Sequence, residues 1–194
     1  MKVAVVKYNA GNVCSVNYAL QRIGINPIIT DNHEELLSAD RIIFPGVGEA
    51  SSAMNYLQSR NLDKLLVALC QPVLGICLGM QLMCSFSEEN NTNCLGIFSE
   101  RVRLFETDSL KVPQIGWNSV TNVKSSLFDG IADNDYFYFV HSYFVECSQH
   151  AISTTSYGVD YSSALQKNNF YAVQFHPEKS GVVGQRLLEN FIRI

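Results

Sequence analysis

The first half of the chain alternates between short, continuous apolar runs and stretches whose apolar residues recur at helical spacing. Residues 3–6 form such a run, which is typical of a strand buried on both faces. Val16, Ala19 and Leu20 then repeat at helical intervals, and Gly24 ends the predicted helix. The same pattern predicts strands at 26–30, 41–44 and 72–76 and a short helix within 31–39. It also predicts a helix over 78–84 and a helical stretch over 50–69 that breaks near 59–61. This alternation predicts a parallel sheet covered by helices on both faces.

The second half consists of strands separated by turns, followed by one helix. The predicted strands lie at 101–105, 118–123, 136–140, 151–156, 163–166 and 170–175. Residues 181–194 form the predicted C-terminal helix, with Val182, Leu187, Leu188 and Phe191 on its apolar side. Residues 87–94 are rich in Glu and Asn and are expected to form an exposed loop. We therefore predict one α/β domain over residues 1–194, with a central mixed, mostly parallel sheet flanked by helices.

Composition and charge narrow the class of protein. The chain has 194 residues, 16% of them charged, and a net charge of −4. This acidic balance argues against a nucleic-acid partner, and the low charged fraction favours apolar surface that a partner protein covers. No apolar run reaches the ~18–20 residues that span a bilayer, and the first apolar run is interrupted too soon for a signal peptide. We therefore expect a cytoplasmic protein without membrane attachment.

One of the six cysteines lies in a sequence typical of a nucleophile. The six show neither a CxxC pair nor the spacing of a zinc finger, so neither a metal site nor a cofactor is expected, and five of the thiols are expected only to fill space. Cys77, in GICLGMQ, has the G-x-nucleophile-x-G form between a predicted strand and a predicted helix. Amides at a helix N-terminus favour the thiolate, and the N–H of Leu78 is placed to help hold an oxyanion. The alternative is an ordinary buried cysteine at a strand–helix junction.

His176 is the best candidate for the base that a cysteine nucleophile needs. His33 and His150 lie in polar sequence and are expected to be solvated. His176 ends a predicted strand, and Glu178, two residues on in an extended segment, faces the same side. Glu178 is thus placed to orient the imidazole, as the third member of a triad does. Taken alone, the pair also fits a strand-end histidine beside a surface carboxylate.

A glycine-rich turn, PGVG at residues 45–48, follows the predicted strand 41–44. In a parallel sheet the turns after neighbouring strands meet at one edge, so this turn is expected beside Cys77 and His176. It can offer a second backbone N–H to an oxyanion hole, although PGVG is equally compatible with a simple tight turn. The segment 136–144 is denser in aromatic residues than a core strand requires.

Five segments together resemble a known family. They are PGVG at 45–48, GICLGMQ at 75–81, PQIGWN at 113–118, FVHSY at 139–143 and QFHPEKS at 174–180. The set, which runs in order over nearly the whole chain, resembles class I (triad) glutamine amidotransferases. Within that family it is similar to the glutaminase subunits of histidine biosynthesis. The resemblance implies a flavodoxin-like architecture and the hydrolysis of L-glutamine to glutamate and ammonia.

The resemblance also implies roles for individual residues. Cys77 would attack the side-chain amide of glutamine to form a thioester, and His176, oriented by Glu178, would move the protons. The residues implied in the oxyanion hole are Val47, Gly48 and Leu78, the turn contributing only after a rearrangement. Those implied around the substrate are Gln81, Glu89, Ser142 and Tyr143. Those implied to face the partner are Trp117, Tyr138 and Lys179.

The implied partner is a (β/α)8-barrel cyclase that forms a heterodimer with the glutaminase and carries the ammonia through its central channel. One segment departs from the family pattern. The first loop reads KYNAGN at residues 7–12, with Lys7 where the family often has an acidic residue, so no role for an acid carries over.

Three alternatives remain open at the level of sequence. The same glutaminase chemistry also serves sugar-modifying synthetases, whose subunits can resemble this chain. A binding subunit that keeps the fold without the chemistry usually lacks a triad member, whereas all three are present here. A cysteine hydrolase or stress-response protein with a similar nucleophile turn would not need the late His-Pro-Glu.

Overall fold

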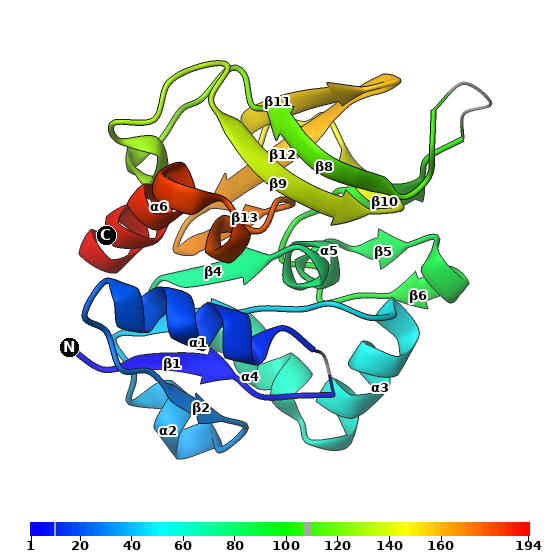
Figure 1. Ribbon diagram of the computed structural model, residues 1–194. Coiled ribbons are helices and arrows are strands. Elements are labelled where there is room, and N and C mark those ends of the chain that lie inside the picture. Colours follow the sequence, from blue (N-terminus) through cyan, green and yellow to red (C-terminus); the bar gives the residue numbers. More distant parts are fainter. Residues whose placement is uncertain (10, 107–109) are drawn as a thin grey trace.

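A central mixed sheet organises the computed structural model, which describes residues 1–9, 11–106 and 110–194 (Figure 1). Ala10, part of the first loop considered above, lies outside the described residues. The helices are α1 (Val13–Arg22), α2 (His33–Leu37), α3 (Ala50–Ser59), α4 (Leu62–Ala68), α5 (Leu78–Met83) and α6 (Gly181–Arg193). The strands of the first half are β1 (Val3–Val6), β2 (Ile28–Thr30), β3 (Arg41–Phe44) and β4 (Val73–Ile76). Those that follow are β5 (Phe86–Ser87), β6 (Thr92–Asn93), β7 (Arg101–Leu104), β8 (Gln114–Ser119), β9 (Tyr136–His141), β10 (Tyr143–Glu146), β11 (Ala151–Tyr157), β12 (Val159–Lys167) and β13 (Phe170–Val173).

Five parallel strands form one half of the sheet, in the order β2-β1-β3-β4-β13. Alternate side chains of β1 point to opposite faces, as the period of a strand requires. Ala4 and Val6 pack in the core that α3 and α4 cover, whereas Val3 and Val5 pack in the core beneath α1 and α6. This strand order is that of flavodoxin-like proteins. The predicted α/β class, with a mixed sheet flanked by helices, is confirmed.

The other half of the sheet is mainly antiparallel. It continues from β13 through β12, β10 and β7 to the short strands β5 and β6, and β11 pairs with β12. Strands β8 and β9 form a separate antiparallel ribbon on the side of β11 and β12 (Figure 1). Within the ranges that the structure describes, no helix has the length and apolarity needed to cross a membrane.

The predicted helices are present, but one strand is misplaced. Val182, predicted on the apolar side of α6, is 86% exposed at the start of the helix. The predicted break near 59–61 is confirmed, because α3 ends at Ser59 and Asn61 adopts a left-handed φ of 54° before α4. The strand predicted at 118–123 lies instead at 114–119. The apolar side chains of Ile115 and Trp117 face solvent there, at 63% and 55% exposure. Apolar periodicity locates a strand only when its apolar face is buried, which explains the error.

The prediction of an exposed loop over 87–94 is also wrong in part. This segment contributes to β5 and β6 and contains a 3-10 turn at Glu89–Asn91. Ser87 and Thr92 are buried despite their polar side chains. The Thr92 hydroxyl donates to the Glu89 carbonyl over 2.7 Å, and the Glu89 N–H donates to the Ser87 hydroxyl over 3.2 Å. These local hydrogen bonds satisfy the polar groups and permit their burial.

The ends of β3, β4 and β13 meet at one edge of the sheet because these strands are parallel neighbours. Two glycines allow the turns that follow them to pack very closely. A Cβ on Gly79, in α5, would lie 1.9 Å from the carbonyl oxygen of Phe44, at the end of β3. A Cβ on Gly46 would lie 2.2 Å from the Tyr8 hydroxyl. The segments PGVG and GICLGMQ are therefore packed backbone against backbone.

Replacing Gly79 by Ala tests this close packing. The added Cβ would force α5 away from β3, so Gly79→Ala is expected to lower the free energy of unfolding by about 3 kcal/mol or more in urea denaturation. Gly24→Ala is the control, since a Cβ there meets nothing within 4 Å and only the left-handed φ of 80° is unfavourable. That control is expected to lose about 1 kcal/mol. Equal losses in the two variants would contradict the packing argument.

Candidate active site

Cys77 occupies a strained turn between β4 and α5. Its backbone has φ 54° and ψ −110°, which an L residue adopts only when the surroundings impose it. The Cys77 N–H donates to the Val173 carbonyl over 2.8 Å, so β13 anchors the turn. The side chain is buried, at 6% exposure. The sequence pattern correctly located this turn, because only glycines at 75 and 79 permit such crowding.

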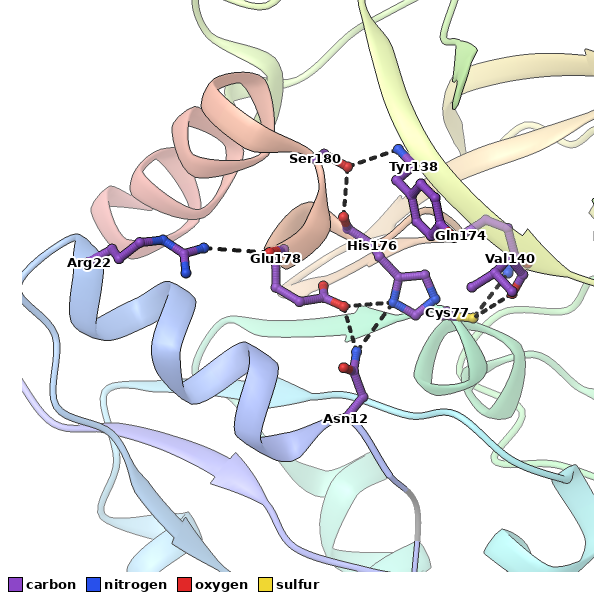
Figure 2. A network of polar contacts seen from close by, with 9 residues as sticks. All are labelled: Asn12, Arg22, Cys77, Tyr138, Val140, Gln174, His176, Glu178 and Ser180. Carbon is purple, nitrogen blue, oxygen red and sulfur yellow. Dashed lines mark hydrogen bonds and ion pairs between the residues drawn. The ribbon is translucent and has the colours of Figure 1, made fainter. Parts of the chain in front are cut away.

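His176 and Glu178 form a buried pair directly after β13. Oε1 of Glu178 lies 2.7 Å from Nδ1 of His176, and both side chains are fully buried. Figure 2 shows the imidazole between the Glu178 carboxylate on one side and Cys77 on the other. Nε2 of His176 is buried without a hydrogen-bond partner among the described residues. The pair predicted from the spacing of two residues is therefore formed, and its unpartnered nitrogen is available on the side of Cys77.

Burial and charge act in opposite directions on His176. Burial alone would lower the pKa of the imidazole, because it disfavours the charged form. The negative charge of Cys77 and the hydrogen bond and charge of Glu178 outweigh burial and raise the pKa from 6.5 to about 10. The imidazolium is consequently the dominant form at neutral pH.

Asn12, immediately before α1, also contacts this pair, and sequence reasoning assigned it no role. Its Nδ2 donates to Oε1 of Glu178 in a short hydrogen bond and lies 3.3 Å from Nδ1 of His176. The residue has a left-handed φ of 75°, which asparagine tolerates better than most residues. Its place in a Gly-Asn dipeptide before a helix was the only available signal, because the contact spans 166 positions to Glu178.

A pocket of about 300 Å³ opens beside Cys77. It is lined by all seven residues predicted for the oxyanion hole and for substrate binding, which are Val47, Gly48, Leu78, Gln81, Glu89, Ser142 and Tyr143. Pro113, Val140 and His141 complete the lining. The sequence thus correctly identified which distant segments meet at this point.

The predicted oxyanion donors are not all free. The N–H of Leu78 donates to the Gly46 carbonyl over 3.3 Å. The Val47 carbonyl accepts from the Gly11 N–H over 3.3 Å, and the Pro45 carbonyl accepts from the Tyr8 hydroxyl over 2.6 Å. The PGVG turn therefore presents its carbonyls to donors on both sides. In this conformation an oxyanion beside Cys77 would compete with Gly46 for the Leu78 N–H.

Two polar side chains of the pocket are held by backbone groups. Oε2 of Glu89 accepts from the Ala50 N–H over 2.7 Å, at the start of α3. Burial is the largest influence on this carboxyl and raises its pKa. Nε2 of Gln81 donates to the Tyr143 carbonyl over 2.9 Å. The pocket is therefore lined by an acidic group and an amide that backbone groups hold in place.

The three residues predicted to face a partner lie together on the outer side of the β8–β9 ribbon. Trp117 and Tyr138 are opposite each other in the strand register, with ring centroids 6.2 Å apart. Nζ of Lys179 lies 5.8 Å from the centre of the Tyr138 ring. The backbone of Tyr138 points the other way, since its carbonyl accepts from the His176 N–H over 2.9 Å. Tyr138 thus contributes its side chain to the outer face and its carbonyl to a hydrogen bond with the backbone of His176.

Three other sequence-based expectations require correction or comment. Cys84 is buried, as expected, but Cys14, Cys70 and Cys147 are exposed and do not fill space in the core. His150 is only partly solvated, because its side chain is 17% exposed and its Nδ1 lies 2.7 Å from Oε1 of the buried Glu100. His33 is exposed, as expected.

Comparisons with known proteins agree with this geometry. The family model described as glutamine amidotransferase class-I matches residues 5–194. A relative from Bacteroides fragilis, named imidazole glycerol phosphate synthase subunit HisH, is 53% identical, with 100% of both chains covered. A relative of the same name from Haemophilus influenzae is 47% identical, with 99% of this chain and 97% of that one covered. A solved structure titled glutamine amidotransferase is similar in fold at 16% identity, with a TM-score of 0.76 and 98% of this chain and 97% of that one covered.

The charge state of His176 can be measured by NMR of its imidazole nitrogens. The wild-type ring is expected to titrate near pH 10. In Cys77→Ala the charge that raises the pKa is gone while burial remains, so the pKa is expected to fall and the neutral ring to appear at lower pH. His141 serves as the internal control, because burial lowers its pKa to about 4 and it is expected to stay neutral at pH 7 in both proteins. An unchanged His176 titration in Cys77→Ala would contradict the coupling.

Proposed function

Because the chain belongs to the class I glutamine amidotransferase family, we propose that it is the glutaminase subunit of an imidazole glycerol phosphate synthase. In this role it hydrolyses L-glutamine to glutamate and ammonia and passes the ammonia to a partner cyclase, in L-histidine biosynthesis in the cytoplasm. The full-length relatives named as HisH subunits support this client over a sugar-modifying synthetase. The observation that carries the proposed chemistry is the buried His176–Glu178 pair beside Cys77, at the wall of a pocket.

The proposed reaction proceeds in two steps. The Cys77 sulfur attacks the side-chain carbonyl carbon of glutamine, and the C–N bond breaks as His176 gives its proton to the leaving nitrogen, which departs as ammonia. His176 then removes a proton from water, whose oxygen attacks the thioester and releases glutamate and the thiolate. Glu178 keeps the imidazole in the required orientation and stabilises its cationic form.

The pocket suits the head group of an amino acid. Glu89 offers a carboxylate to the α-ammonium of glutamine. Ser142 and Tyr143 line the same pocket, where they would contact the α-carboxylate and α-amino groups. With the head held there, the side-chain amide reaches toward Cys77, which shares the same pocket.

A rearrangement of the PGVG turn is needed for full activity. In the proposed active state, Leu78 and either Val47 or Gly48 donate N–H groups to the oxyanion. The hydrogen bond from Leu78 to Gly46 would have to break first. Gly48, with φ 127°, lies where only glycine changes conformation at low cost. We therefore expect weak glutaminase activity in the isolated chain and strong activation by the partner.

The proposed partner surface is the outer face of the β8–β9 ribbon. Ile115, Trp117 and Tyr136 are each more than half exposed there, and an exposed aromatic and aliphatic face is typical of a protein interface. Tyr138 and Lys179 border the same face. A (β/α)8-barrel cyclase seated on it would have its channel close to Val140, whose carbonyl oxygen lies 3.9 Å from the Cys77 sulfur.

Glutamine hydrolysis by the full chain, with and without the cyclase and the ribonucleotide on which the cyclase is expected to act, tests the reaction. Activity is expected to rise strongly when both are added. Cys77→Ala is expected to abolish it, and His176→Ala to lower kcat by about 10³-fold or more. Cys70→Ser, at an exposed cysteine outside the pocket, is the control and is expected to retain full activity. Fast turnover without the cyclase, or activity in Cys77→Ala, would contradict the proposal.

Binding of the cyclase, measured by isothermal titration calorimetry, tests the surface. Trp117→Ala is expected to weaken binding by about tenfold or more, because a large, central aromatic side chain dominates such interfaces. Tyr18→Ala removes a comparably exposed aromatic side chain on α1, outside the ribbon, and is expected to leave binding unchanged. A larger loss from Tyr18→Ala than from Trp117→Ala would place the interface elsewhere.

A further inference from the structure

A second buried amide lies against the Cys77 sulfur. Gln174 follows β13 and is fully buried. Its Oε1 lies 3.0 Å from Nε2 of Gln81, and its Nε2 lies 3.7 Å from Sγ of Cys77. Figure 2 shows Gln174 reaching the sulfur from the side of β9, away from Glu178. The His-Pro-Glu chemistry described above makes no use of this residue.

The orientation of both amides follows from a single backbone group. The Tyr143 carbonyl is only an acceptor, so the atom of Gln81 that lies 2.9 Å from it must be the NH2 group. The second proton of that NH2 group points to Gln174, whose nearer atom must then be the oxygen. The remaining atom of the Gln174 amide, which faces Cys77, is therefore its NH2 group. No alternative flip of either amide satisfies all three contacts.

We infer that Gln174 donates an N–H to the Cys77 thiolate and takes part in the proposed reaction, held in this orientation by Gln81. The inference rests on the proposed function and adds a second stabiliser of the sulfur's negative charge beside the His176 imidazolium. A hydrogen bond to an ionised acceptor is stronger than one to a neutral acceptor, and burial of the amide strengthens it further. Gln174 is thus a catalytic residue, and Gln81 is its positioning residue.

The Val140 carbonyl, which also contacts the sulfur, explains why the thiolate needs a donor such as Gln174. The Val140 carbonyl lies 3.9 Å from Sγ and can accept a proton from the thiol but gives nothing to the thiolate. Without Gln174, the groups next to the sulfur on that side would favour the neutral thiol. The Gln174 amide can donate to the thiolate and the Val140 carbonyl can accept from the thiol, so these two groups accommodate both protonation states of the sulfur.

The same assignment restricts what Gln81 offers to a ligand. Both N–H groups of Gln81 are used, one by Tyr143 and one by Gln174. Only its oxygen, an acceptor, remains for a ligand in the pocket. Gln81 therefore suits the α-ammonium of an amino acid and disfavours its carboxylate.

Alkylation of Cys77 by iodoacetamide, measured against pH on the full chain, tests the donor without any glutamine turnover. The modified peptide that carries Cys77 is quantified by mass spectrometry, so that the exposed cysteines do not interfere. Gln174→Met keeps the length of the side chain and removes the N–H. The midpoint of its pH profile is expected to move upward by about one pH unit, which lowers the alkylation rate at the wild-type midpoint about fivefold, with the high-pH plateau unchanged. A purely structural role would change the plateau and leave the midpoint in place.

Two further variants keep the inference falsifiable. Gln81→Leu leaves Gln174 intact but free to rotate, and is expected to shift the midpoint in the same direction by a smaller amount. Gln166→Met, on β12, removes an amide that contacts Tyr171 and is the matched control, with no expected shift. If Gln174→Met and Gln81→Leu fold as the wild type does and neither shifts the midpoint, the inference is wrong. A shift in a chain that fails to hydrolyse glutamine with the cyclase would support the hydrogen bond and contradict the proposed function.

Discussion

The close approach of α5 to the end of β3 is the constraint on which the candidate site depends. With less than van der Waals space for a Cβ between Gly79 and the Phe44 carbonyl, α5 must start directly against the end of β3. The chain can enter α5 only through the strained backbone of Cys77. The energy of this strain is offset by the buried parallel strands on either side, which hold the turn rigidly. A reactive sulfur is thereby fixed at the sheet edge instead of relaxing into the core.

Two buried histidines near this edge illustrate how surroundings decide charge. His176 has a carboxylate on one ring nitrogen and Cys77 on the other side, and its pKa is raised to about 10. Among the described residues, His141 has the Tyr143 carbonyl and the Tyr161 hydroxyl as hydrogen-bond partners, and burial lowers its pKa to about 4. The charge of His176 acts in the same direction on the pKa of His141. A neutral His141 avoids a second positive charge beside His176.

The sequence was sufficient to predict the features that arise from local patterns. Buried parallel strands, the Cys77 turn and the two-residue spacing of His176 and Glu178 each follow from neighbours along the chain. Features produced by tertiary contacts were missed. Asn12 reaches His176 across 164 positions and Gln174 reaches Cys77 across 97, so neither has a local signal. The misplaced strand has a related cause, because apolar residues on β8 face outward. Apolar periodicity locates an element only where apolar side chains are buried, and the exposed Ile115 and Trp117 do not meet that condition.

Tyr138 has a consequence for the evolution of this surface. Its side chain is part of the outer face of the ribbon, while its carbonyl holds the His176 backbone and its N–H donates to the Ser180 hydroxyl over 2.9 Å. The same residue therefore links the outer face to the backbone that carries the imidazole. Any substitution that shifts β9 to improve an outside contact also displaces the histidine. Substitutions tolerated on this exposed strand are therefore those whose side chains leave the peptide backbone in place.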